Sequence, residues 1–332
     1  MTYSTGGLIE ATDYNTFATN LNAIWSTGSG DSGWGQTTIS SVSTGGIVTA
    51  TNWATIVNNL STSGAQTNTT ITSRTAPVTG NVIAILANVA TDITSCTTNR
   101  GNATSSGAEV GYASGTTTLT TNFPVANPSQ VTWTITFTHT VTFPSANQAR
   151  YFWNAGGRVR LQYGKSTTGT DIDPDWNTLA GQPGSIYITG RVNSAAQTIA
   201  AVSYTGTTRI GGTGGTQTTL ATTTGWYQLV GTPTTIFQLN NATSPYTGEY
   251  IRTTATQTSS TVLTLVTTWF QPAVSAAGTT TNITGGTAPA VGAVTITGTG
   301  PTTLCTYFPP STAQGLSNSW GTPVIAATTS VA

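Results

Sequence analysis

Apolar side chains in the first hundred residues recur at the spacing of one face of an α-helix. In segment 11–24 they occupy positions i, i+3, i+4, i+7 and i+10, namely Tyr14, Phe17, Ala18, Leu21 and Ile24. The motif ATDYNTFATNLNAI from Ala11 is echoed by ATNWATIVNNL from Ala50, so the pattern predicts two related short helices. Thr12 and Thr51 are the expected N-caps of these helices.

A third helix is predicted over residues 82–97, and Gly101 is placed to end it. Its apolar stripe consists of Val82, Leu86, Val89, Ile93 and Cys96. Helices this short do not persist alone and must bury their apolar stripes against neighbours. We therefore expect residues 1–104 to form a small helical domain for attachment or oligomerisation, with its core made within one chain or shared between subunits.

From about residue 105 the hydrophobic period changes from 3.6 to 2, which is the period of β-strands. In VTWTITFTHTVTF, residues 131–143, apolar side chains alternate with threonines, as in a half-buried strand or two strands joined by a bulge. Further runs of this kind are RVRLQY, SIYITG, GWYQLV, TTIFQL, GEYIRT and STVLTLVTTWF. The predicted fold is mainly β with a small N-terminal α-helical region, the β-part being an antiparallel sandwich of jelly-roll or immunoglobulin-like type.

This sandwich is expected to span residues 105–272. The segment 273–332 is richer in glycine and threonine and has smaller apolar residues, so it predicts a β tail or an arm that wraps a neighbour. Trp320 indicates that the end of this tail is packed and ordered.

Charged residues make up only 5% of the chain, against roughly a quarter in ordinary soluble domains. Nine basic and nine acidic residues cancel, so we expect no binding of nucleic acid or of acidic membrane surfaces. A neutral chain also lacks a main protection against association, which favours a stable homo-oligomer. The 28 aromatic residues, at strand and helix periods, argue against a disordered, mucin-like stalk.

Targeting and membrane signals are not apparent. No run approaches 18 apolar residues, so no membrane insertion is expected. The N-terminus has no basic region followed by an apolar run, so no export signal is expected.

The ionisable residues offer few sites for chemistry. Cys96 and Cys305 match no zinc or redox spacing, and two buried thiols are expected rather than a disulfide. Asp171, Asp173 and Asp175 alternate, and they converge on Ca²⁺ only if their loop curls. The EF-hand pattern fails there, which favours a solvated loop. We therefore predict no metal site and no cofactor.

A catalytic centre is not predicted either. A glycosidase needs two carboxylates about 5 to 9.5 Å apart, whereas Glu10, Glu109 and Glu249 are isolated in sequence. His139, the only histidine, is accompanied by no nucleophile motif and is expected in or beside the core. The run Gly211–Gly215 has no following helix, so it predicts a hairpin tip rather than a phosphate loop.

Two sets of side chains, three arginines and three tryptophans, could either bind a ligand or serve the fold alone. Arg150, Arg158 and Arg160 would contact an anion or a subunit, or else Arg158 and Arg160 share the polar face of one strand while Arg150 caps the preceding loop. Three tryptophans would stack on sugar rings if exposed, although most tryptophans in such a sheet belong to the core; these are Trp34, Trp176 and Trp226.

Several segments resemble uncharacterised virion structural proteins of tailed phages, especially phages of cyanobacteria. The segments that carry the resemblance are DYNTFATNLNAIWSTGSGDSGWGQ with ATNWATIVNNL, FTHTVTFPSANQARYFWNAGGRVRLQYG, DPDWNTLAG, TGWYQL, YTGEYI and LSNSWGTP. Such proteins are tail fibres, neck appendages or capsid-associated proteins, and the resemblance implies no catalytic residues.

The sequence therefore predicts a non-enzymatic virion protein, exposed on the particle after assembly in the host cytoplasm. A trimeric tail or neck fibre or appendage subunit is the leading hypothesis, with other virion proteins and host-surface glycans as partners. A capsid decoration or cement protein is one alternative. A glycan-degrading, tailspike-like enzyme is the other.

Overall fold

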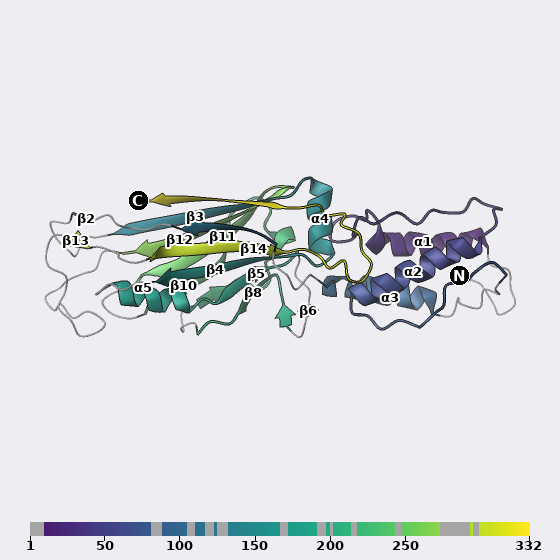
Figure 1. The fold of residues 1–332 in the computed structure, drawn as a ribbon, viewed down its shortest axis with the longest axis horizontal. Helices are drawn as coiled ribbons and strands as arrows, with labels where there is room; N and C mark the ends of the chain where they lie inside the picture. Colours follow the sequence, from purple (N-terminus) through teal and green to yellow (C-terminus); the bar gives the residue numbers. More distant parts are fainter. Residues whose placement is uncertain are drawn as a thin grey trace.

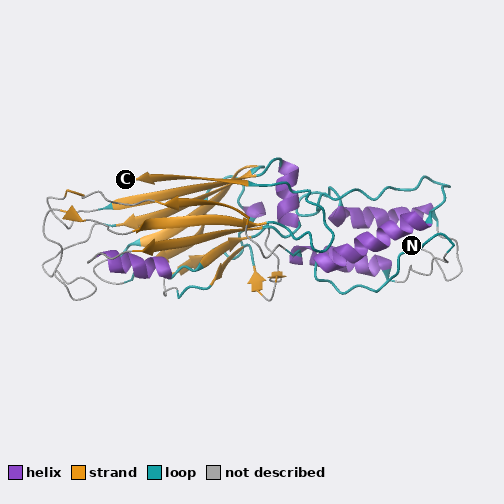
Figure 2. Ribbon diagram, in the orientation of Figure 1, coloured by secondary structure: helices purple, strands orange, loops and turns teal. Residues whose placement is uncertain are grey.

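The protein is an elongated body with helices at one end and β-sheets at the other (Figures 1 and 2). The computed structural model describes residues 10–80, 88–104, 110–116, 123–124, 132–166, 172–190, 197–199, 202–213, 218–242, 247–272, 293–294 and 299–332. The strands run along the long axis, and a short helix, α4 (Ala146–Asn154), lies between the two ends.

Three helices form the narrow end: α1 (Ala11–Trp25), α2 (Ala50–Gln66) and α3 (Val89–Thr98), which continues into the 3₁₀ turn η1 (Asn99–Asn102). The predicted first two helices are confirmed, but their caps lie further upstream. Glu10 is the N-cap of α1 without a side-chain bond, and Thr49 caps α2 in a reciprocal arrangement with Asn52. The predicted third helix is confirmed from Val89, while residues 81–87 lie outside the described residues.

The apolar stripes of the three helices bury one another within one chain. Trp53 of α2 is fully buried, with ring centroids 5.8 Å from Tyr14 and 5.9 Å from Phe17 of α1. Ile93 and Cys96 of α3 are also buried in this cluster. The sequence left open whether this core forms within one chain or is shared between subunits. In the structure it forms within one chain.

An extended segment, residues 37–42, lies along α1 and is held by two asparagines two turns apart. The Asn22 amide donates to the Ile39 carbonyl and accepts from the Ile39 N–H, both at 2.9 Å. Asn15 makes the same pair of bonds with Val42, both at 2.8 Å. Each side-chain amide thus takes the place that a neighbouring strand would occupy, so an irregular segment keeps its backbone groups satisfied.

The wide end contains two antiparallel sheets. The five-stranded sheet has the order β1 (Val110–Thr116), β14 (Thr299–Phe308), β4 (Arg158–Ser166), β5 (Ser185–Ile188) and β8 (Thr207–Ile210). The six-stranded sheet has the order β15 (Val324–Val331), β3 (Trp133–Thr142), β12 (Val262–Gln271), β11 (Tyr250–Ser259), β10 (Thr234–Asn240) and β9 (Thr218–Leu220). Two further pairs are β13 (Ala293–Val294) with β2 (Phe123–Pro124), and β6 (Gln197–Ile199) with β7 (Val202–Tyr204).

The two sheets pack face to face around the core. Tyr163 of β4 stacks on Phe237 of β10 at 5.7 Å, and its hydroxyl is 2.7 Å from Thr253 of β11. The prediction of a mainly β protein with a small N-terminal helical region is confirmed. The finer assignment to a jelly-roll or immunoglobulin-like sandwich stays a prediction.

Strand β3 shows why the alternating pattern was informative. It is one strand of ten residues, with Phe137 and His139 on the buried face and threonines at the even positions on the outer face. It pairs without a bulge along its whole length with β12, so the alternative of two strands joined by a bulge is wrong.

Two segments differ from the sequence-based prediction, and one helix, α4, was not predicted at all. GWYQLV contains the 3₁₀ turn η3 (Trp226–Gln228) instead of a strand. The acidic segment enters α5 (Ile172–Gly181) instead of a loop; Pro174 is tolerated in the first turn because the N–H groups there have no helical acceptor.

The segment 273–332 was expected to form a tail or an arm. Two of its described strands belong to the two sheets: β14 lies between β1 and β4, and β15 pairs with β3. The expected boundary at residue 273 therefore does not separate this segment from the sheets.

Candidate functional site

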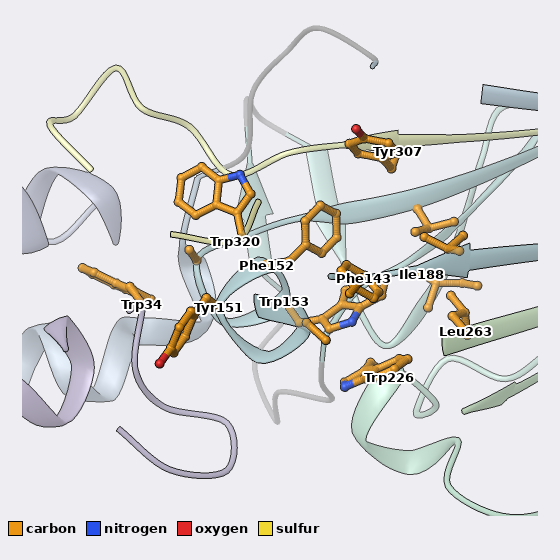
Figure 3. Packing of buried hydrophobic residues seen from close by; sticks show 14 of the residues in the cluster. Trp34, Phe143, Tyr151, Phe152, Trp153, Ile188, Trp226, Leu263, Tyr307 and Trp320 are labelled. Atoms are coloured by element: carbon orange, nitrogen blue, oxygen red, sulfur yellow. The ribbon is translucent and has the colours of Figure 1, made fainter. Parts of the chain in front are cut away.

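The most elaborate polar arrangement in the described chain is the joint between the helical bundle and the sheets. Four segments distant in sequence meet there: the loop 26–36 after α1, helix α4, the turn η3, and the connection 309–323 between β14 and β15 (Figure 3). Each of these segments overlaps one of the stretches that resemble virion proteins of tailed phages.

Aromatic side chains anchor the β-side of the joint. Ser145 caps α4 by accepting from the Gln148 N–H at 3.2 Å, which directs Phe152 and Trp153 into the core. Trp153 stacks on Trp226 at 5.5 Å, and Phe143 packs against Phe152 at 5.1 Å. Burial of these rings fixes α4 and η3 against the ends of the strands.

Asn154 connects the two halves. Its backbone carbonyl accepts from the Trp34 indole N–H at 3.1 Å, and its side-chain amide donates to the carbonyls of Gly33 at 3.2 Å and Gly30 at 3.3 Å. The Tyr227 hydroxyl donates to Asn154 Oδ1 at 2.7 Å. One residue at the end of α4 thus holds the loop 26–36 against the β-region through both its backbone and its side chain.

Two glutamines complete the polar contacts. Gln36 Oε1 accepts from the Ser317 N–H at 2.8 Å, and Gln36 Nε2 donates to the Ser317 carbonyl at 3.0 Å. Gln66 Nε2, at the end of α2, donates to the carbonyls of Thr104 at 2.8 Å and Ala155 at 2.9 Å. These glutamine amides are neutral, so their contacts are insensitive to salt in a way that ion pairs are not.

Two glycines permit the close approach. Gly35 has φ +69°, and a Cβ built there would lie 2.3 Å from the Tyr151 ring. Gly156 has φ +106°, and its Cβ would lie 2.3 Å from the Ala103 carbonyl oxygen. A side chain at either position would push the two halves apart.

The three arginines have different environments. Arg158 and Arg160 share the outer face of β4, as one interpretation of the sequence predicted, and the Arg158 guanidinium lies 4.6 Å from the Phe308 ring centroid. Arg150 does not cap the loop before it. Instead it donates to the Thr27 carbonyl, so it belongs to the joint.

The three tryptophans considered for sugar stacking are buried. Trp34 and Trp226 are each 1% exposed and Trp176 is 0% exposed. Trp34 packs in the joint, and Trp176 donates to Gln271 Oε1 at 2.8 Å. The interpretation as sugar platforms is therefore wrong for all three, because no ligand reaches these rings in the folded chain.

The carboxylates that the structure describes do not assemble into a recognisable centre. Asp171 and Glu109 lie outside the described residues, as do the side chains of Asp173 and Asp175, whose backbone is in α5. Glu249 is fully buried and accepts from Asn241 at 2.9 Å. No group of three or more His, Cys, Asp or Glu side chains suited to a metal was found in the part of the chain that the structure describes.

Cys96 and Cys305 are free and buried, as expected. Burial raises the pKa of the Cys96 thiol from 9.0 to about 11 and also raises the pKa of Cys305. His139, on the inner face of β3, is fully buried in the core.

A surface feature that the sequence reasoning missed lies on the outer face of the six-stranded sheet. Tyr250 of β11 and Phe270 of β12 are register partners with stacked rings 5.0 Å apart, and Arg252 lies 5.0 Å from the Tyr250 ring centroid. All three side chains are half-buried, so one side of this cluster faces solvent. The alternation of β11 and β12 carried the signal, because it places both rings opposite the core.

None of the described helices has the length and apolar character that a membrane span requires. Comparisons with protein-family models, curated proteins and solved structures found no match for this chain.

Replacing Gly35 by alanine is expected to separate the helical bundle from the β-region, because the new Cβ meets the Tyr151 ring at a positive φ. Gly45→Ala is the matched control: φ is +78° there, and nothing lies within 4 Å of its Cβ. The control should show only the backbone cost of about 1–2 kcal/mol. Limited proteolysis and denaturant unfolding measure the difference, and equal effects of the two substitutions would contradict a tightly packed joint.

The thiols are expected to resist a thiol reagent at neutral pH in the folded protein and to react fully after unfolding.

The raised pKa of Cys96 means that folding favours the neutral thiol. This contribution is present below pH 9 and is lost as the pH rises toward about 11. Denaturant unfolding across this range should show falling stability, with a smaller slope in Cys96→Ala. An unchanged slope would contradict the burial effect.

Proposed function

We propose that the chain is a non-enzymatic structural protein of a tailed-phage virion, a homo-oligomeric fibre or appendage subunit on the tail or neck. The observation that carries the proposal is the joint: a helical bundle is fixed end-on to a β-region by neutral hydrogen bonds and close glycine contacts. A fixed joint makes one elongated body that transmits force and orientation from an attachment end to a distal end.

Within this proposal the helical bundle attaches to other virion proteins. Its apolar stripes are already buried inside the chain, so attachment uses the polar surface and the connecting loops. Ile47, 86% exposed, and Val78, 66% exposed, lie in the loops before and after α2 and supply apolar contact points for a partner.

The β-region presents its outer face to host-surface glycans. Thr134 of β3, the register partner of Phe270, and Thr268 of β12 lie on the same outer face as the stacked Tyr250–Phe270 pair, and such a mixture of hydroxyls and partly exposed rings suits the hydrogen-bonding edges and apolar faces of sugars. Weak single contacts gain strength through several copies on one particle.

The position of the chain on an intact particle tests the structural role. Labelled antibody against the pure protein should bind at the tail or neck of particles viewed by electron microscopy. Dense labelling over the head would instead identify a capsid decoration protein. Absence from purified particles, or release of reducing sugars from host glycans by the pure protein, would overturn the proposal.

The outer-face cluster is tested separately by glycan binding. Phe270→Ala should weaken binding of the pure protein to host envelope glycans about tenfold, because one stacking platform worth roughly 1.4 kcal/mol is lost. Tyr250→Phe keeps the ring and should bind as the wild type does. Thr138→Ala, on the same face, controls for unspecific surface changes; an equal loss there would contradict a specific role of the rings.

A further inference from the structure

Strand β15 is an edge strand whose own sequence lacks the usual protection, although β1 of the other sheet lies close to it. It lies at the end of the six-stranded sheet, pairs with β3 over eight residues without a bulge, and runs along the border of the molecule in Figure 1. Its sequence, VIAATTSV, contains no charge and no proline. Charged side chains, prolines, bulges and short lengths are the features that keep edge strands from pairing with other chains.

The remaining sheet edges do carry such features. β1 has a register shift between Val110 and Tyr112, β9 has only three residues, and β8 has four residues including Arg209. β15 is therefore the edge of the described sheets best suited to pairing with another strand.

The register shows which backbone groups are available. Thr134 and Ala332 exchange both backbone hydrogen bonds, at 2.7 and 2.9 Å, so even-numbered residues of β15 point their N–H and C=O groups toward β3. The odd-numbered residues point theirs away from it: Ile325, Ala327, Thr329 and Val331. Among the described residues these four have no backbone hydrogen-bond partner.

We propose that β15 pairs antiparallel with β15 of a second copy of this chain, about a two-fold axis through Thr328. In this register Ile325 faces Val331, and Ala327 faces Thr329, so all four outward residues find partners inside the other β15. The two six-stranded sheets become one continuous sheet, with the inner faces of both copies on the same side.

The side chains fit this register. On the inner face Ile325 of each copy lies beside Val331, which is 45% exposed in the single chain and gains an apolar neighbour. On the outer face the two Thr328 side chains meet at the axis, and threonine pairs are favourable across strands. No charge on either strand opposes the approach.

This contact defines the oligomer of the proposed function and in that respect rests on it. A two-fold axis predicts a dimer instead of the trimer expected from the sequence. Position on the particle and pairing through β15 are independent measurements, so either can fail without the other.

Disulfide trapping tests the register directly. In the proposed register Thr328 lies opposite Thr328 of the second copy, as a non-hydrogen-bonded pair of an antiparallel ladder. The Cα atoms of such a pair lie about 4.5 Å apart, which is within the range of a disulfide. Thr328→Cys in the full chain should therefore form a covalent dimer under mild oxidation. Ala326→Cys is the matched control: it is equally exposed, but its symmetry mate lies about 13 Å away along the strand, so it should stay uncoupled. The native thiols are buried and do not interfere.

Charge variants provide a second test that needs no covalent bond. Thr328→Lys and Thr328→Asp should each shift the protein from dimer to monomer in sedimentation velocity, because like charges meet at the axis. A mixture of the two variants should restore the dimer. Thr219→Lys, on the opposite edge of the same sheet, should leave the dimer unchanged.

A wild-type protein that stays monomeric at all concentrations would overturn the inference. So would equal cross-linking of the two cysteine variants. An oligomer that persists in Thr328→Lys would overturn the β15 contact while leaving a homo-oligomeric virion protein in place.

Discussion

The structure depends on one constraint: backbone groups of its irregular segments must find partners in a chain that has few charges. Side-chain amides meet this need. Asn15 and Asn22 hold the extended segment beside α1, while Gln36 and Asn154 hold the joint, and each makes paired or multiple bonds to backbone groups. An amide offers both a donor and an acceptor, so it can replace a missing strand where a carboxylate or a guanidinium cannot.

The sequence predicted those parts of the fold in which one periodicity runs through a whole element. The stripes of α1 and α2 and the alternation in β3 are long, so local pattern and tertiary burial agree. Short segments were different. WYQ in η3 is dense in aromatic residues, and such density without a periodic spacing does not distinguish a strand from a turn of helix. Helix α4, which ends in YFWN, was not predicted from the sequence.

The joint could not be predicted from the sequence because its partners lie far apart in the chain. Asn154 and Gly33 are separated by 121 residues, and Gln36 and Ser317 by 281. No local signal marks an asparagine or glutamine as a buried connector. The same argument explains why Trp34 and Trp226 were considered as binding platforms: burial is decided by long-range packing, not by the residues beside them.

The placement of β14 has a consequence for biosynthesis. This strand separates β1 from β4 in the five-stranded sheet, although it follows them by more than a hundred residues. Until β14 has been synthesised, the edges of β1 and β4 that pair with it have no partner strand. The sheet closes only when residues 299–308 have left the exit tunnel. Until then the facing edges of β1 and β4 stay unpaired in the nascent polypeptide, and unpaired strand edges promote aggregation.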